Sequence, residues 1–134
     1  MRLFYLTHDG KEFNQAFKFE GDLVAGYASL LTSSPCQFSI EALEETELLL
    51  LPFKEITELF DKDHSLERLG RKVAEQHFLN KEKREAAFLL LNAKERYEEL
   101  LKERPNINQR VPQYHIASYL GITAEGLNRL LKDL

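Results

Sequence analysis

The stretch VPQYHIASYLGITAEGLNRLLKDL, residues 111–134, decides the fold, because its spacing is that of two short helices joined by a tight turn. Pro112 favours the start of the first helix, since its ring presets a helical φ. Gly121 can adopt the positive φ that ends a helix. Thr123 then stands where the second helix needs an N-cap, because its hydroxyl can accept a hydrogen bond from a backbone N–H. These residues predict a helix-turn-helix.

Both predicted helices have an apolar face. On the first helix, Ile116, Ala117 and Leu120 share one side. The second helix would bury leucines at i, i+3, i+4 and i+7, namely Leu127, Leu130, Leu131 and Leu134. An ordinary helical hairpin is the alternative, but the spacing Ala-x-x-x-Gly-x-x-x-x-x-Leu favours DNA binding. The opposite face of the second helix carries short or hydrogen-bonding side chains that suit a DNA groove: Ala124, Glu125, Asn128, Arg129 and Lys132.

The composition is that of a chain with a real hydrophobic core. At 134 residues and 43% hydrophobic content, it can form one good-sized domain or two small ones. No apolar run approaches the roughly 18 residues of a membrane helix, and we expect no export signal. Cys36 is the single cysteine and cannot form an internal disulfide, which fits a reducing cytoplasm. The net charge of −4 disfavours indiscriminate nucleic-acid binding but permits a local reading face.

The first 52 residues have the pattern of β-strands. RLFYLT and EFNQAFKF, residues 2–7 and 12–19, predict a hairpin whose turn contains the dipeptide Asp9-Gly10. We expect further strands at Asp22–Ala25, Gln37–Leu43 and Glu47–Leu51. Pro52 ends the leucine run, and residues 53–61 then predict a short helix whose inward side chains are Phe53, Ile56, Leu59 and Phe60.

A long helix is predicted next, over residues 65–91. This stretch contains no proline and only Gly70, and a solitary helix of this length would be poorly buried. A second copy of the chain packed along its stripe is the natural solution, so we expect a homodimer. Asn92 and Glu95 then predict the start of another helix, which would bury Tyr97, Leu100 and Leu101 and end before Pro105. Residues 106–111 are expected to be a connector.

This order of pieces resembles one family of bacterial regulators. The motifs that carry the resemblance are FEGDLVAGYASLLTSSPCQFSIEALEETELLLLPFKEITELFD, RLGRKVAEQHFLNKEKRE, NAKERYEELLKERPNINQRVP and IASYLGITAEGLNRL. They resemble the Crp/Fnr superfamily of transcription regulators, in its branch with a shortened C-terminus. The resemblance implies an α+β fold with three segments: a partial antiparallel, jelly-roll-like β-roll at 1–64, a long dimerisation helix at 65–92 and a helix-turn-helix domain at 93–134. We expect the N-terminal part of the roll and the closing strands of a full wing to be absent.

The resemblance also implies where a ligand would bind. In relatives that bind cyclic AMP, a Gly-Glu-Leu motif holds the ribose and an Arg-Ser pair holds the cyclic phosphate. The matching positions here are Gly21, Asp22 and Leu23, followed by Cys36 and Gln37. Neither Cys36 nor Gln37 supplies the positive charge that a buried phosphate needs. We therefore expect no response to cyclic AMP, and the residues indicate no cofactor and no particular small-molecule effector.

On the recognition helix, the family's base-reading positions fall on Ala124, Glu125 and Arg129, with Tyr114 and Gly126 near the DNA backbone. A carboxylate can accept from cytosine N4, and a guanidinium can donate to both O6 and N7 of guanine. The alternative for Glu125 and Arg129 is an exposed ion pair one helical turn apart. We expect these residues to read double-stranded DNA.

The sequence offers little sign of an enzyme or a metal site. Its histidines fall in separate predicted elements without metal-ligand spacing, and Cys36 has no partner for an iron–sulfur cluster. No glycine-rich phosphate loop or nucleophile elbow is present. Three function classes stay open: a dimeric DNA-binding regulator, a ligand-sensing module with a degenerate helix-turn-helix, and a dimerisation partner that inactivates a full-length relative.

Overall fold

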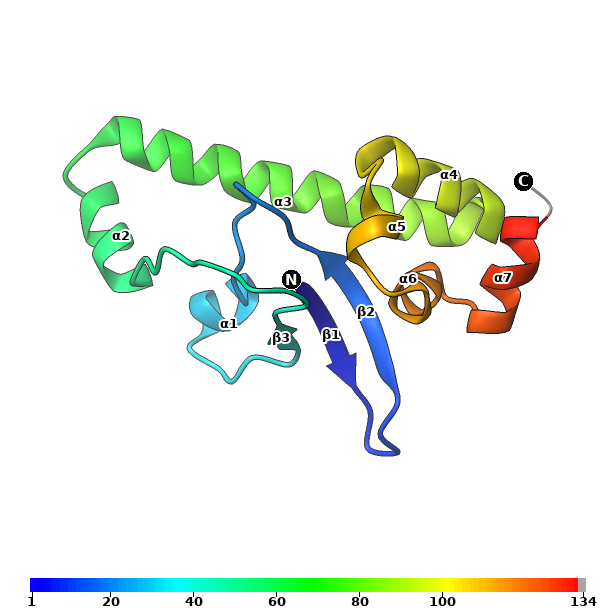
Figure 1. The fold of residues 1–134 in the computed structure, drawn as a ribbon. Helices are drawn as coiled ribbons and strands as arrows, with labels where there is room; N and C mark the ends of the chain where they lie inside the picture. Colours follow the sequence, from blue (N-terminus) through cyan, green and yellow to red (C-terminus); the bar gives the residue numbers. More distant parts are fainter. Residues whose placement is uncertain (133–134) are drawn as a thin grey trace. The chain divides into compact units, whose positions relative to one another are not determined.

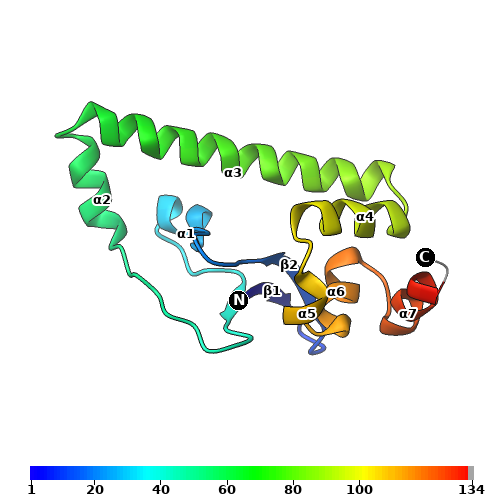
Figure 2. The ribbon, with the colours of Figure 1, turned by 45° about the horizontal axis from the view of Figure 1, so that its top comes forward.

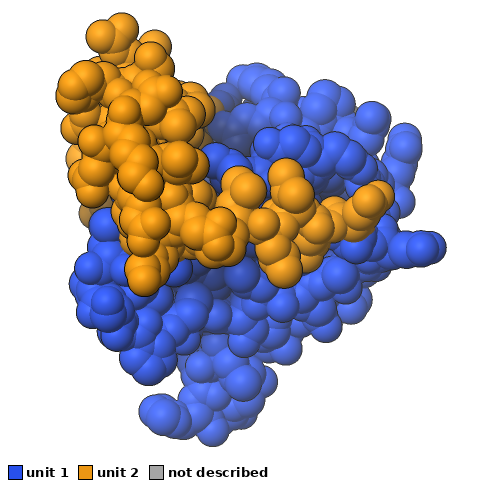
Figure 3. Space-filling view, turned by 90° about the vertical axis from the view of Figure 1, so that its left-hand side faces the viewer, with its two compact units in different colours: residues 1–46, 93–134 blue, residues 47–92 orange. Residues whose placement is uncertain are grey.

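A computed structural model describes residues 1–132 and divides the chain into two compact units. The first unit joins residues 1–46 to the chain from residue 93 onward, and the second is formed by residues 47–92 (Figure 3). The three segments expected from the sequence, 1–64, 65–92 and 93–134, remain a prediction of the domain organisation. In the first unit, segments that are far apart in the sequence fold together.

The first unit contains a small antiparallel sheet. Strands β1 (Arg2–Leu6) and β2 (Glu12–Phe17) form the predicted hairpin, and Gly10 in its turn has a φ of 82°. Strand β3 (Ser39–Glu41) pairs with the other edge of β1, so the strand order is β2-β1-β3 (Figure 1). Within the described residues the sheet has these three strands and does not close on itself.

Two of the expected strands are wrong, and a third is shorter than expected. At Asp22–Ala25 the chain turns instead, because Gly21 has a φ of 78° and the Asp22 carboxylate accepts the Phe19 N–H. The run Glu47–Leu51 finds no neighbouring strand among the described residues, and its leucines are exposed. A leucine run becomes a strand only where another strand satisfies its backbone groups. The strand expected at Gln37–Leu43 is reduced to β3.

A short helix, α1 (Tyr27–Thr32), lies in the region for which the sequence predicted only strands and turns. In its last turn, the Thr32 hydroxyl donates a hydrogen bond to the Ala28 carbonyl. Ser33 ends the helix in the left-handed conformation, with a φ of 51°.

The second unit is a pair of helices. Helix α2 (Phe53–Phe60) packs on α3 (His64–Leu90), where Gly70 leaves room for the Phe60 ring. Asp63 caps α3 by accepting the Ser65 N–H. Both helices agree with the sequence prediction to within one residue at each end. Helix α3 is 27 residues long, and none of its residues is fully buried in the described structure.

The C-terminal helices belong to the first unit. They are α4 (Ala93–Glu103), α5 (Ile107–Arg110), α6 (Gln113–Leu120) and α7 (Ala124–Lys132). The segment expected to be a connector contains α5. Helix α6 contacts α4, α7 and strand β2, so it lies at the centre of this group (Figure 2). The core around it is formed by Phe17, Tyr97, Leu100, Ile107, Val111, Ile116, Ala117, Leu120 and Leu127.

The fold is therefore α+β, as predicted, with a three-stranded sheet and seven helices within residues 1–132. In the same described range, no helix is both long enough and apolar enough to cross a lipid bilayer.

Candidate nucleic-acid interface

The turn between α6 and α7 has the geometry that the sequence predicts. Pro112 precedes the first residue of α6, and Gly121 ends that helix with a φ of 71°. The Ile122 N–H donates to the Ala117 carbonyl at 3.0 Å, which satisfies the end of the helix. Thr123 caps α7, since its hydroxyl oxygen accepts the Gly126 N–H at 3.0 Å.

The structure gives a reason for a glycine at position 126, inside α7, that the sequence did not reveal. Glycine inside a helix costs roughly 1 kcal/mol relative to alanine. A Cβ at this position would lie 3.3 Å from the Thr123 hydroxyl oxygen, the atom that caps the same helix. That distance is tight, so the absence of a side chain helps Thr123 keep its capping position.

Helix α7 separates its two faces clearly. Leu127 is buried, and Leu130 and Leu131 are half-buried against the core. Leu134, which was also expected to pack inward, lies outside the described residues. The predicted reading face points to solvent, and its exposed members are Thr123, Ala124, Glu125, Asn128, Arg129 and Lys132.

The charged side chains of this face are exposed to solvent. Among residues 1–132, Glu125, Arg129 and Lys132 take part in no ion pair. In particular, the helix-stabilising pair between Glu125 and Arg129, which the sequence left as an alternative, is not formed there. Tyr114 at the start of α6 is also exposed. Exposed groups of this kind are free to meet an external partner.

Helix α4 fixes the end of α6. Arg96 on α4 donates from two of its nitrogens to the Leu120 carbonyl, at 2.9 and 3.2 Å. The Tyr97 hydroxyl accepts from the Asn108 amide at 2.7 Å, which ties α5 to the same helix. The helix-turn-helix therefore rests on α4 through both apolar and polar contacts.

On another side, strand β2 is hydrogen-bonded to α6. The Ser118 hydroxyl accepts the Asn14 N–H at 3.0 Å and donates to the Glu12 carbonyl at 3.0 Å. The Phe17 and Tyr119 rings add a contact with centroids 5.3 Å apart. An outer edge of a sheet normally leaves such backbone groups unpaired. Here a serine of the helix satisfies two of them.

A buried polar cluster lies between the sheet and α6. Its members Arg2, Asn14 and His115 are each 4% exposed or less. The Arg2 guanidinium donates to Glu12 at 2.6 Å, to Glu41, and to Nδ1 of His115 at 3.0 Å. Burial would lower the pKa of Arg2, but the hydrogen bonds and charges of Glu12 and Glu41 outweigh it and raise that pKa. The pKa of His115 is lowered, first by burial and then by the Arg2 charge.

The positions implied for ligand binding have structural partners. Asp22 accepts from the Phe19 N–H at 2.9 Å and from Arg104 at 2.8 Å. Gly21 supplies the turn before it, and Leu23 is exposed. Cys36 is exposed, and its sulfur would lie 2.7 Å from a Cβ added to Gly26. Gln37 follows it in a loop.

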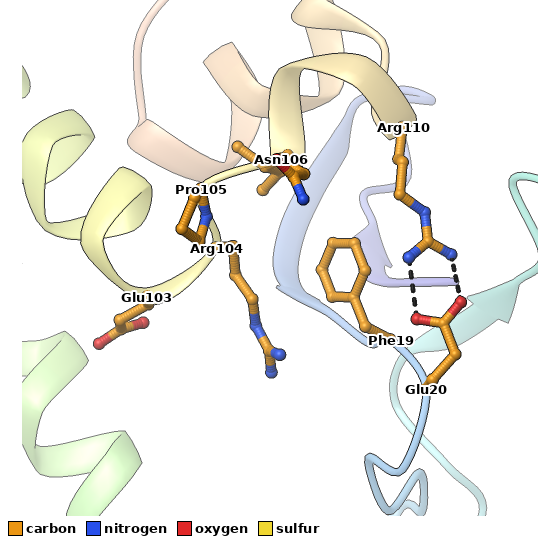
Figure 4. A pocket seen from close by; sticks show the side chains of 8 residues that line it. Phe19, Glu20, Glu103, Arg104, Pro105, Asn106 and Arg110 are labelled. Atoms are coloured by element: carbon orange, nitrogen blue, oxygen red, sulfur yellow. Dashed lines mark hydrogen bonds and ion pairs between the residues drawn. The ribbon is translucent and has the colours of Figure 1, made fainter.

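A surface pocket of about 260 Å³ is lined by Arg104, the partner of Asp22, together with Phe19 and Arg110 (Figure 4). The guanidinium groups of Arg104 and Arg110 each lie 5.0 Å from the centre of the Phe19 ring. Arg110 donates to both oxygens of Glu20 and also to Glu44. Its hydrogen bonds to Glu20 lower the pKa of that carboxyl to about 2. Both arginines are thus paired with carboxylates, and the pocket offers no uncompensated positive charge of the kind a phosphate needs.

No protein-family model matches this sequence, and no curated protein matches it. In the described residues, no group of three or more histidine, cysteine, aspartate or glutamate side chains is arranged to hold a metal ion. The geometry of α6 and α7 is therefore the observation that bears on function.

Proposed function

We propose that this chain is a sequence-specific DNA-binding transcription regulator of the Crp/Fnr type, which acts as a homodimer and does not respond to cyclic AMP. One observation carries the proposal. Helix α7 follows a closed Gly121 turn, buries Leu127, and keeps Glu125, Arg129 and Lys132 exposed and unpaired among the described residues.

The exposed face of α7 has groups for reading bases in the major groove. Arg129 would donate to O6 and N7 of a guanine, and Glu125 would accept from N4 of a cytosine. Asn128 can pair with adenine in the same way, and the Ala124 methyl can touch a thymine methyl. Lys132 and Tyr114 would contact phosphates, which fixes orientation without reading sequence. Thr123 holds the first turn of α7 that enters the groove.

The unpaired state of the two charges supports base reading over helix stabilisation. An ion pair one turn apart on an exposed helix contributes about 0.3–0.5 kcal/mol, so forming it would have been a sufficient reason for these residues. That pair is not formed in the described structure. Both side chains remain available to a partner.

Dimerisation would be provided by α3. Leu69 and Val73 follow one another on this helix at the spacing of a coiled-coil seam, and they are 57% and 40% exposed. A second copy related by a two-fold axis would cover both side chains. It would also present two α7 helices to a site with matching two-fold symmetry.

In this proposal the three-stranded sheet corresponds to part of the family's β-roll. Cyclic AMP would find no phosphate partner there, because neither Cys36 nor Gln37 is cationic. The Asp22 carboxylate, at the position implied for the ribose, is already engaged with the Phe19 N–H and Arg104. The ligand-sensing module with a degenerate helix-turn-helix is the second candidate. Two departures from the family favour it: relatives often have arginine at the position of Ala124, and a hydroxyl that donates to phosphate at the position of Gly126.

The test is fluorescence anisotropy of the purified protein with a DNA site selected from a random pool. Arg129→Ala should cost about 1–3 kcal/mol and relax the preference at one guanine in each half-site. Lys132→Ala should weaken all sequences alike and flatten the salt dependence. Glu125→Ala should change the tolerated base without changing the salt slope.

Lys62→Ala is the matched control, since it also removes one exposed cation but lies between α2 and α3. It should leave affinity and salt slope as in the parent. If Arg129→Ala and Lys132→Ala bind as well as Lys62→Ala does, α7 is not in the groove. The second candidate would then replace the first.

A further inference from the structure

His115 connects the β1–β2 hairpin of the first unit to helix α6. It lies on α6, the first helix of the helix-turn-helix, and is 4% exposed beneath the sheet. Two groups of the hairpin converge on its Nδ1: the Arg2 guanidinium at 3.0 Å and the Asn14 amide nitrogen at 3.3 Å. Asn14 also donates to the His115 carbonyl at 3.1 Å. One residue thus joins both strands of the hairpin to α6.

The direction of these hydrogen bonds fixes the state of the ring. Arginine and the nitrogen of an asparagine amide can only donate, so Nδ1 of His115 must be an unprotonated acceptor. A second proton on the ring would sit on that atom. The protonated Nδ1 would then be a donor that faces the Arg2 and Asn14 donors, where an attractive contact had been. The Arg2 donor also carries a buried positive charge.

We propose that His115 is a proton-sensitive clamp: protonation of its ring releases the β1–β2 hairpin from α6. Glu12 on β2 and Glu41 on β3 also face the cluster and favour the charged ring, but they are hydrogen-bonded to Arg2, which lies nearest to Nδ1. Helix α4 places Arg96 on the Leu120 carbonyl at the other end of α6. The charges of α7 lie on its exposed face. The clamp requires no DNA, so it stands apart from the proposed function.

The sign of the pH dependence follows from the lowered pKa of His115. The closed form keeps the ring neutral, whereas the opened form protonates near the ordinary histidine pKa of about 6.5. The closed form is therefore most stable above about pH 6.5. Below that pH, the equilibrium constant for closing falls by about tenfold for each pH unit. The loss ends below the pKa of the closed form, where both forms are protonated.

The experiment is amide hydrogen exchange at pH 7.5 and 5.5, corrected for the intrinsic exchange rate. The Asn14 N–H is the reporter, because it donates to Ser118 across the contact in question. Its protection factor should fall severalfold to tenfold at the lower pH in the parent. In His115→Asn it should not change, since Oδ1 takes the place of Nδ1 as an acceptor that does not titrate. In His8→Asn, a change at the exposed hairpin turn, it should fall as in the parent.

A second measurement covers the case in which His115→Asn fails to fold. Nitrogen chemical shifts of the parent report directly which ring nitrogen of His115 carries the proton. They should report an unprotonated Nδ1 down to a pH below the ordinary histidine range. An unchanged Asn14 protection factor in the parent, or a His115 ring that becomes charged while Asn14 stays protected, would overturn the clamp.

Discussion

Replacement of Ile116 by alanine should destabilise the first unit by about 3–4 kcal/mol. Ile116 is 0% exposed at the centre of α6, so the three carbons that are removed lose their full burial. At about 0.8 kcal/mol for each buried carbon, the transfer term is about 2.4 kcal/mol. The cavity that remains among packed side chains adds to it, within the range of about 2–5 kcal/mol for such substitutions. Ile116→Val removes one carbon and should cost about 1 kcal/mol.

The assay is urea unfolding followed by tyrosine fluorescence. All five tyrosines lie in the first unit, and the chain has no tryptophan, so the signal reports that unit alone: Tyr5, Tyr27, Tyr97, Tyr114 and Tyr119. Gln113→Ala, at the exposed first residue of the same helix, is the control and should stay within about 0.5 kcal/mol of the parent. A loss for Ile116→Ala that is no larger than that of the control would refute the packing of α6 described above.

Three further outcomes are expected. Sedimentation should give a dimer at micromolar concentration, and Val73→Asp should shift it toward monomer because a charge would enter the α3 seam. The control Phe78→Asp, about 140° around the helix from Val73, should leave the dimer intact. A parent that is monomeric would exclude the α3 dimer. Calorimetric titration with cyclic AMP should give no measurable binding below millimolar concentration, whereas micromolar affinity would require a cation that the loop lacks. In a carboxyl NMR titration Glu20 should stay ionised to a pH of about 2. Arg110→Ala should return the pKa of Glu20 toward about 4.3, so an unchanged titration would contradict that ion pair.

The helix-turn-helix could be predicted because its signals are local. Pro112, Gly121 and Thr123 each act on the backbone within a few residues, and the leucine spacing of α7 repeats every turn. The bounds of α2 and α3 were predicted to within one residue, whereas the short helices α1 and α5 were not predicted. The exposed face of α7 follows directly from that spacing.

The sheet was harder to predict, because a strand depends on partners that lie far away in the sequence. The leucine run after residue 47 has the composition of a strand but no strand to pair with in the described chain. At Asp22 one side chain turned the backbone where the apolar pattern favoured extension. The Arg2–Asn14–His115 cluster joins residues 113 positions apart. Its only sequence signal is a polar residue inside each of three apolar stretches.

Selection of binding sites from a random DNA pool tests the central claim most directly. The full chain should enrich a pseudo-palindrome whose half-sites lie about 34–36 Å apart, one turn of the double helix, because a two-fold dimer presents two equivalent α7 helices. Each half-site should contain the guanine that Arg129 reads. A pool that shows no enriched sequence after repeated rounds, with the protein folded and dimeric, would contradict the assignment of α7 as a recognition helix.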